Sequence, residues 1–210
     1  MKKNNYSGRF IVFEGLDGSG QSTQAKLLKN FLIEKGINVV LTKEPTNDSC
    51  AGKKIRKILD KETKADSLGL QKLFTADRKE HLDNLIMPAL KAGKFVISDR
   101  YFFSTFAYGK ADGLNLQELI RINDNFLLPD LTVILDASAK ICVSRIERRG
   151  IEKTLFEKEK KLSQVLENYK IFPKMFDNTI IINGEKPIRE VFNQIKEVVV
   201  SKILGQSYEK

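Results

Sequence analysis

The chain has 210 residues, of which 41% are hydrophobic and 30% are charged. This length suffices for one ordinary domain with a single sizeable core, and the composition excludes a disordered or fibrous protein. The net charge of +9 favours an anionic ligand, but charge alone does not separate nucleotides from nucleic acid or an acidic membrane surface.

The apolar runs and the cysteines indicate a cytoplasmic protein without a membrane partner. The apolar runs are far shorter than the roughly 20 residues that a spanning helix needs, and Glu14 interrupts the first one before a signal-peptide core is complete. Cys50 and Cys142 lie far apart, and the single histidine, His81, cannot form a metal site alone. We therefore expect two free thiols in a reducing compartment.

Short β-branched or aromatic runs alternate along the chain with longer stretches of helical spacing. The strand candidates are Arg9–Glu14, Ile37–Thr42, Lys94–Ser98, Leu131–Asp136 and Thr179–Ile182. The helical stretches run from Ser22 to a stop at Gly36, from Leu68 to Lys91 with a break or kink at Pro88, over Ala139–Arg149 with Ser138 as a cap, and onward from Pro187. No repeat or linker divides these elements, which predicts one domain over residues 1–210.

Strands that are separated by helices predict an α/β fold: a five-stranded parallel sheet with helices on both faces. Such sheets bind ligands beyond the carboxyl ends of their strands. The residues that follow each strand are therefore the first candidates for a functional site.

A glycine-rich segment follows the first predicted strand and nearly matches the phosphate loop GxxxxGK[ST]. It consists of Gly15, Leu16, Asp17, Gly18, Ser19, Gly20, Gln21, Ser22 and Thr23. The glycines allow successive backbone N–H groups and a helix N-terminus to point at phosphate oxygens, and the Ser22 hydroxyl is placed to ligate Mg²⁺. Gln21 departs from the motif, because it replaces the lysine that neutralises the β- and γ-phosphates.

Charged residues also follow the second and third predicted strands. Glu44 and Pro45 follow the second strand, and Asp99 and Arg100 follow the third. Asp99 can hold the Mg²⁺ shell or take a proton from an acceptor, and Arg100 offers a bidentate fork for an acceptor phosphate. We expect these residues to face the phosphate loop.

In order and spacing, these motifs resemble the thymidylate kinases. The resemblance extends from Phe10 to about Val199 and rests on Phe13–Gly20, Glu44–Pro45, Leu73–Arg78, Asp99–Tyr101 with Ser104, Ala107 and Tyr108, and Pro129–Leu131. It implies a P-loop kinase that uses ATP and Mg²⁺ to phosphorylate dTMP, giving dTDP and ADP. It also implies a homodimer.

The resemblance further implies roles for individual residues. Phe74 would stack on the thymine ring, Arg78 would bind the edge of that ring, and Arg100 would hold the dTMP phosphate. The acceptor site would also include Glu44, Pro45, Ser104 and Tyr108, and the ATP site would include the phosphate loop, Arg145 and Asn183. We expect catalysis to involve Asp17, Asp99, Arg100, Arg149 and Lys153, with Ser22 and Asp99 as metal ligands. Without the resemblance, a core position would suit Phe74 nearly as well, because it lies beside Leu70 and Leu73 on a predicted helix. Tyr108 would by default be a core residue and Arg78 a surface residue.

The segment at about 145–157 resembles the short mobile lid that closes over ATP in this family. Family members with a glycine at the position of Gly18 usually carry a lid arginine where this chain has Leu155. Two expected cations, at positions 21 and 155, are therefore missing together. Arg145, Arg148, Arg149 and Lys153 are the available substitutes, and Lys153 is the first choice because it lies within the lid.

Three other functions are compatible with parts of the sequence. The acceptor could be dUMP or another pyrimidine monophosphate, because Gly109 stands where many bacterial family members have glutamine. Gln21 and Leu155 would also suit a nucleotide-binding protein that has lost catalysis. Nucleic-acid binding is suggested by charge alone; the lysines are scattered and no nucleic-acid-binding module is recognisable, so we expect no nucleic-acid partner.

Overall fold

The computed structural model describes residues 1–148 and 155–205, with the side chains of 155–158 left aside. Five parallel strands form one sheet in the order β2-β3-β1-β4-β5. They are β1 (Phe10–Gly15), β2 (Val39–Lys43), β3 (Phe95–Asp99), β4 (Leu131–Asp136) and β5 (Thr179–Asn183). Each strand lies within two residues of its predicted bounds, which confirms the α/β class and the parallel sheet.

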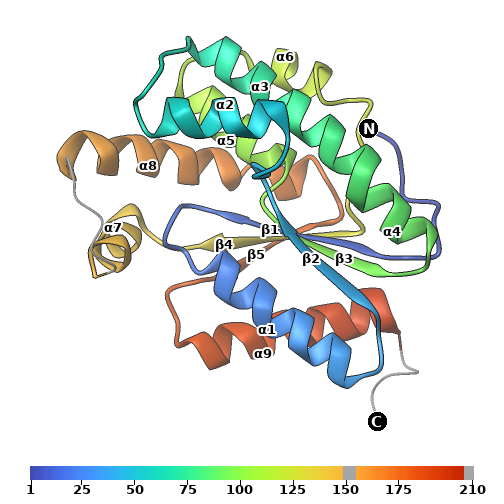
Figure 1. Cartoon of the computed structure of the whole chain (residues 1–210). Helices are drawn as coiled ribbons and strands as arrows, with labels where there is room; N and C mark the ends of the chain where they lie inside the picture. The colour runs from blue at the N-terminus through green and yellow to red at the C-terminus, as the bar shows by residue number, and fades with distance from the viewer. Residues whose placement is uncertain (149–154, 206–210) are drawn as a thin grey trace.

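Helices cover both faces of the sheet, as predicted (Figure 1). The α-helices are α1 (Gln21–Glu34), α2 (Cys50–Leu59), α3 (Ser67–His81), α4 (Met87–Lys91), α5 (Phe102–Ala111), α6 (Leu116–Arg121), α7 (Ala139–Glu147), α8 (Leu155–Tyr169) and α9 (Ile188–Val199). In Figure 1, α1 and α9 pack below the sheet, whereas α3, α5 and α8 lie above it. Among the described residues, no helix combines the length and apolar composition that crossing a membrane requires.

Strand β1 shows how both faces of the sheet are buried. Its side chains alternate between two cores: Phe10 and Val12 join the aromatic core above the sheet, and Ile11 and Phe13 join the aliphatic core below. All four are fully buried, which explains why this strand has an uninterrupted apolar run in place of an alternating pattern. The core above the sheet is rich in aromatic rings in tilted and edge-to-face contact, among them those of Phe102, Phe103, Phe106 and Phe172.

The helices differ from the prediction in several details. Helix α1 begins one residue early, at Gln21, and α7 ends at Glu147. Ser138 occupies the N-cap position of α7, as predicted, but its side chain forms no capping hydrogen bond. Instead, its backbone N–H donates to a carboxylate oxygen of Glu185 at 2.8 Å, which ties the start of α7 to the turn after β5.

Pro88 does not by itself break the long predicted helix. The irregularity lies before it, in a π-helical turn (Leu82–Ile86), and Pro88 occupies the first turn of α4, where its missing N–H costs little. Helices α2, α5 and α6 were not predicted. The apolar residues of α5 form a continuous run and α6 has only 6 residues, so neither has a clear period, whereas α2 is amphipathic, with Ala51 and Ile55 on its buried face. Most of the predicted lid, 149–154, lies outside the described residues.

Candidate functional site

The carboxyl ends of the strands enclose a cavity of about 250 Å³. Its lining comes from the phosphate loop, the ends of β2 and β3, and α7: Asp17, Gly18, Gly20, Gln21, Ser22, Thr23, Lys43, Asp99, Arg100 and Ile146. Parallel pairing causes this convergence, since Phe13 is in register with Asp99, and Asp99 with Lys43. The structure thus brings the loop together with Asp99 and Arg100, as expected from the strand ends.

The backbone of the phosphate loop requires its glycines. Gly15, Gly18 and Gly20 have φ values of 143°, 90° and 108°, a region that residues with a Cβ rarely adopt. A Cβ on Gly18 would also lie 2.5 Å from the carbonyl oxygen of Cys142. Gly20 is the N-cap of α1, so the N-terminus of this helix opens into the cavity and favours an anion there. Within the loop, Leu16 and Ser19 are buried and Thr23 is half-buried.

Ser22 and Asp99, the two residues expected to hold the metal, lie next to each other in the cavity. The Ser22 hydroxyl donates a short hydrogen bond to Asp99 Oδ2 across the cavity. A hydroxyl and a carboxylate at this position fit Mg²⁺, which takes few protein oxygens and completes its shell with water and substrate phosphates. The Nζ atom of Lys43, which we had not considered, lies 3.7 Å from the same carboxylate oxygen.

Gln21 is held inside the loop. Its side chain is 5% exposed, and its amide Nε2 donates to the carbonyl oxygen of Gly15 at 3.0 Å. Its Oε1 accepts a longer contact of 3.4 Å from Arg100 Nη2. The glutamine side chain therefore stabilises the loop through its backbone. A lysine at this position would instead extend toward the phosphates.

Arg100 links the phosphate loop to the start of α5. Its Nη2 pairs with Asp17 Oδ1 at 2.8 Å, its Nη1 donates to Ser104 Oγ at 2.8 Å, and its guanidinium lies 5.5 Å from the centre of the Tyr108 ring. Burial alone would lower the pKa of Arg100, but the Asp17 carboxylate and the other anionic groups nearby raise it, so the side chain stays charged. Its φ of 76° is unusual for a residue with a side chain and is typical of functional sites.

A buried carboxylate supports Arg100 from behind. Glu14 is fully buried and accepts hydrogen bonds from the Tyr101 N–H at 2.8 Å, the Ser104 hydroxyl at 2.6 Å and the Tyr169 hydroxyl at 2.9 Å. Burial raises the pKa of Glu14 to about 7, although Arg100 and these hydrogen bonds act in the opposite direction. Its position within an apolar strand was a signal for such a role, whereas nothing in the sequence pointed to Tyr169.

Arg78 lies in the interior and not on the surface. It is 1% exposed, with Nε and Nη2 bound to Glu44 Oε2 at 2.9 and 2.8 Å and Nη1 bound to Asn123 Oδ1 at 2.6 Å. The hydroxyl of Thr105 lies 3.4 Å from both Nη atoms. Of the five N–H donors of the guanidinium, these contacts leave two that are engaged only weakly, by Thr105.

Apart from Glu44, Arg78 and Arg100, the residues of the predicted acceptor site are half-buried. Phe74 lies one helical turn before Arg78 on α3 and is half-buried, so its ring is not part of the deep core. Pro45 follows Glu44 through a cis peptide bond and is also half-buried. Tyr108 is half-buried beside Arg100. The roles of these residues toward a nucleotide stay predictions.

Arg145 joins the phosphate loop to the turn after β5. Its Nη1 donates to the carbonyl oxygens of Gly184 at 3.0 Å and Ser19 at 3.3 Å. Asn183 is exposed at this turn and accepts a hydrogen bond from the Glu185 N–H at 2.9 Å. Arg149 and Lys153 lie outside the described residues, as does the side chain of Leu155.

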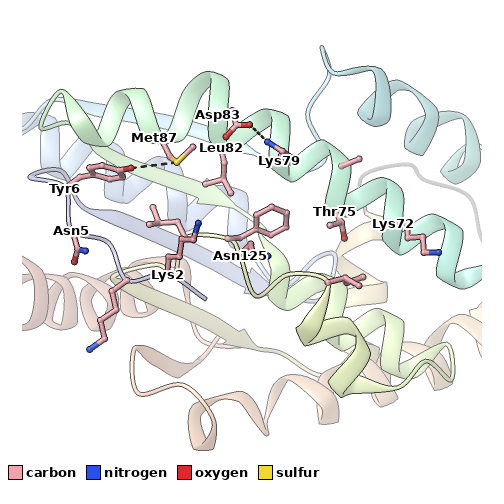
Figure 2. Close-up of a pocket in the computed structure, with 15 residues that line it drawn as sticks. Lys2, Asn5, Tyr6, Lys72, Thr75, Lys79, Leu82, Asp83, Met87 and Asn125 are labelled. Carbon is pink, nitrogen blue, oxygen red and sulfur yellow. Dashed lines mark hydrogen bonds and ion pairs between the residues drawn. The ribbon is translucent and has the colours of Figure 1, made fainter.

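A larger hollow lies elsewhere in the described part of the chain. It has a volume of about 1120 Å³ and is lined by the N-terminal segment, α3 and the start of α4, as Figure 2 shows for Tyr6, Lys79 and Met87. It includes no strand end of the sheet and no residue of the phosphate loop. Convergent polar groups favour the smaller cavity as the candidate functional site, whereas a choice by volume would favour the larger one.

Comparison with known proteins agrees with this geometry. The thymidylate kinase family matches residues 13–195. A probable thymidylate kinase of Thermococcus gammatolerans is 45% identical over 207 residues, covering 94% of this chain and 99% of that protein. One of Pyrococcus horikoshii is 44% identical over 204 residues, covering 94% and 98%. A thymidylate kinase of Desulfotalea psychrophila is 37% identical over 198 residues, covering 93% and 98%. On the extent of these matches, the chain belongs to the thymidylate kinase family.

Proposed function

We propose that this protein is an ATP-dependent dTMP kinase. In the reaction, an oxygen of the dTMP phosphate forms a bond to the γ-phosphorus of ATP while the bond from that phosphorus to the β–γ bridging oxygen breaks, giving dTDP and ADP. The observation that carries the proposal is the convergence of Arg100 with Ser22 and Asp99 around one cavity. An arginine for the acceptor phosphate thus faces a hydroxyl–carboxylate pair for the donor side.

The acceptor oxygen does not need a general base. The second pKa of a phosphate monoester is about 6, so the dTMP phosphate is mostly dianionic near pH 7. Catalysis then depends on positioning and charge stabilisation, which is what phosphoryl transfer demands. Mg²⁺, held by Ser22 and Asp99, would supply positive charge toward the β- and γ-phosphates. Arg100 would orient the acceptor phosphate, with Asp17 beside it at the acceptor sugar and phosphate.

The base and the sugar of the acceptor would contact three half-buried or buried side chains. Phe74 would stack on thymine, and Arg78 would offer its two weakly engaged N–H donors to the edge of the ring. Tyr108, beside Arg100, would pack against the deoxyribose. Glu44 and Pro45 would shape the same site, because Glu44 fixes the guanidinium of Arg78.

The remaining family features belong to the proposal as well. These are a single domain over 1–210, a lid at about 145–157 that brings Arg149 and Lys153 to ATP, a homodimer, and a cytoplasmic location. ATP would lie along the phosphate loop toward Arg145 and Asn183. Light scattering of the purified protein tests the homodimer, with a mass near twice the 23.9 kDa of one chain as the expected result.

Substrate specificity is tested by ADP formation with Mg-ATP against dTMP, dUMP, UMP, dCMP, CMP, AMP and GMP. We expect dTMP to give the highest kcat/KM.

The role of Arg100 is tested by a substitution. Arg100→Met should lower kcat/KM for dTMP by about 10²-fold or more, since it removes a charged donor to the acceptor phosphate. Arg121→Met, on the outer helix α6, is the control and should leave the rate unchanged. A faster reaction with another monophosphate would replace dTMP as the acceptor, and ATP binding without turnover would indicate a protein that has lost catalysis.

A further inference from the structure

The phosphate loop lacks a cation of its own. Gln21 occupies the position of the motif lysine, and its buried amide is tied to the Gly15 carbonyl oxygen. A neutral side chain in this position cannot follow the negative charge that develops during transfer of a phosphoryl group. A cation from another part of the chain must therefore approach the same phosphates.

Among the described residues, the cations that line the phosphate cavity are Arg100 and Lys43. Arg100 is engaged, because it binds Asp17 and Ser104 at 2.8 Å each and its side chain is 12% exposed. Lys43 differs in both respects: its side chain is 57% exposed, and its Nζ lies 3.7 Å from Asp99 Oδ2. That distance exceeds the roughly 2.7–2.9 Å of a charge-assisted hydrogen bond, so the ammonium is weakly held.

The sheet fixes the position of Lys43. It is the last residue of β2, and its Cα is in register with that of Asp99 on β3. The Asp99 carboxylate in turn accepts the hydrogen bond from Ser22 at the start of α1. The ammonium thus lies beside the pair that would hold Mg²⁺, at the part of the cavity where the β- and γ-phosphates would lie.

We propose that Lys43 neutralises the β- and γ-phosphates of ATP in this protein, in place of the lysine missing at position 21. This inference rests on the proposed kinase function and assigns the role to a strand residue in addition to any lid cation. When ATP binds, the ammonium exchanges its long contact with Asp99 for phosphate oxygens. Asp99 then becomes available as a metal ligand. A lysine suits this exchange, because its ammonium is a point charge on a flexible stem.

A double-mutant cycle of Lys43→Met and Gln21→Lys tests the proposal. Methionine keeps an unbranched stem but removes the charge. With saturating dTMP, Lys43→Met should lower kcat by about 10²-fold or more when residue 21 is glutamine. The loss should fall below about tenfold in the Gln21→Lys background, since the two cations serve the same phosphates and their effects are not additive.

Two further variants exclude a merely structural effect. Lys43→Arg keeps the charge and should retain most of the activity. Lys94→Met removes an exposed lysine directly before β3, at the opposite end of the sheet, and should leave kcat unchanged. Calorimetry adds a measurement that does not depend on turnover: Lys43→Met should weaken ATP binding about tenfold more than ADP binding, because ADP lacks the γ-phosphate.

Equal losses of kcat in both backgrounds, or an unchanged ratio of ATP to ADP affinity, would overturn the assignment of Lys43. A natural protein that does not phosphorylate dTMP would instead refute the proposed acceptor. In that case the ratio of the two affinities still decides whether Lys43 contacts the terminal phosphate.

Discussion

The buried Arg78–Glu44 pair gives a sharp test of how the acceptor side is held together. The two side chains are 1% and 3% exposed, and Arg78 Nη2 lies 2.8 Å from Glu44 Oε2. At this distance, an effective dielectric constant of about 20 gives a gross attraction of about 6 kcal/mol. The desolvation of both ions, at several kcal/mol each, offsets most of this attraction. The intact pair therefore adds little net stability, but a single partner left alone is costly.

We expect Arg78→Met to lower the free energy of unfolding by about 3–5 kcal/mol, because it leaves the buried Glu44 carboxylate without the arginine. The His81 ring nitrogen, 3.2 Å from Glu44 Oε1, then remains as its side-chain partner. Glu44→Gln should be destabilising for the converse reason. The double variant should cost clearly less than the sum of the two single changes, because no uncompensated charge remains. Urea denaturation at one protein concentration, followed by circular dichroism, measures all four proteins.

The neighbouring residue Lys79 supplies the control. It forms an exposed i,i+4 pair with Asp83 at 2.6 Å (Figure 2), and Lys79→Met should cost no more than about 0.5 kcal/mol. If Arg78→Met were as mild as Lys79→Met, the buried network would not be what holds β2, α3 and α5 together. Additive losses in the double variant would contradict the reasoning as well.

Three further predictions follow from single sites. The fold raises the pKa of Glu14 from its ordinary 4.5 to about 7, so the folded state keeps this proton to higher pH than the unfolded state. The stability that the protonated Glu14 contributes is therefore lost as pH rises from about 4.5 to 7. The unfolding free energy of Glu14→Gln relative to the natural protein should therefore increase by about 3 kcal/mol across that interval, and a flat difference would refute the shift. Gly18→Ala should abolish ATP binding measured by calorimetry, because its φ is 90° and its new Cβ would meet the Cys142 carbonyl oxygen; retained affinity would show that the loop can adapt. Ellman's reagent should modify one thiol per native chain, at exposed Cys50, and two in denaturant, because burial raises the pKa of Cys142 to about 12; two fast native thiols would contradict this.

Much of the fold could be predicted because local signals agreed with the tertiary structure. Each strand is a short apolar run, and burial on both faces of a parallel sheet requires such runs, as β1 illustrates with Phe10 to Phe13. The phosphate loop could be predicted from the sequence for a related reason. Its backbone needs φ values that residues other than glycine avoid, so the spacing of the glycines indicates the geometry of the loop. The helices α5 and α6 were not predicted, because a continuous apolar run and a six-residue element have no clear helical period. Helix α2 was not predicted either, although its buried Ala51 and Ile55 keep helical spacing.

The sequence by itself determined which groups follow β1 and β3: a glycine-rich loop, a serine, an aspartate and an arginine. Their roles toward phosphate, Mg²⁺ and an anion stay predictions. These groups follow strands whose parallel order places them at one edge of the sheet. Only the tertiary structure decided which side chains support or replace them. Glu14 and Tyr169 are 155 positions apart and meet behind Arg100, and Lys43 reaches the cavity because β2 pairs with β3. Such contacts depend on strand order and register, which no local segment of the chain encodes.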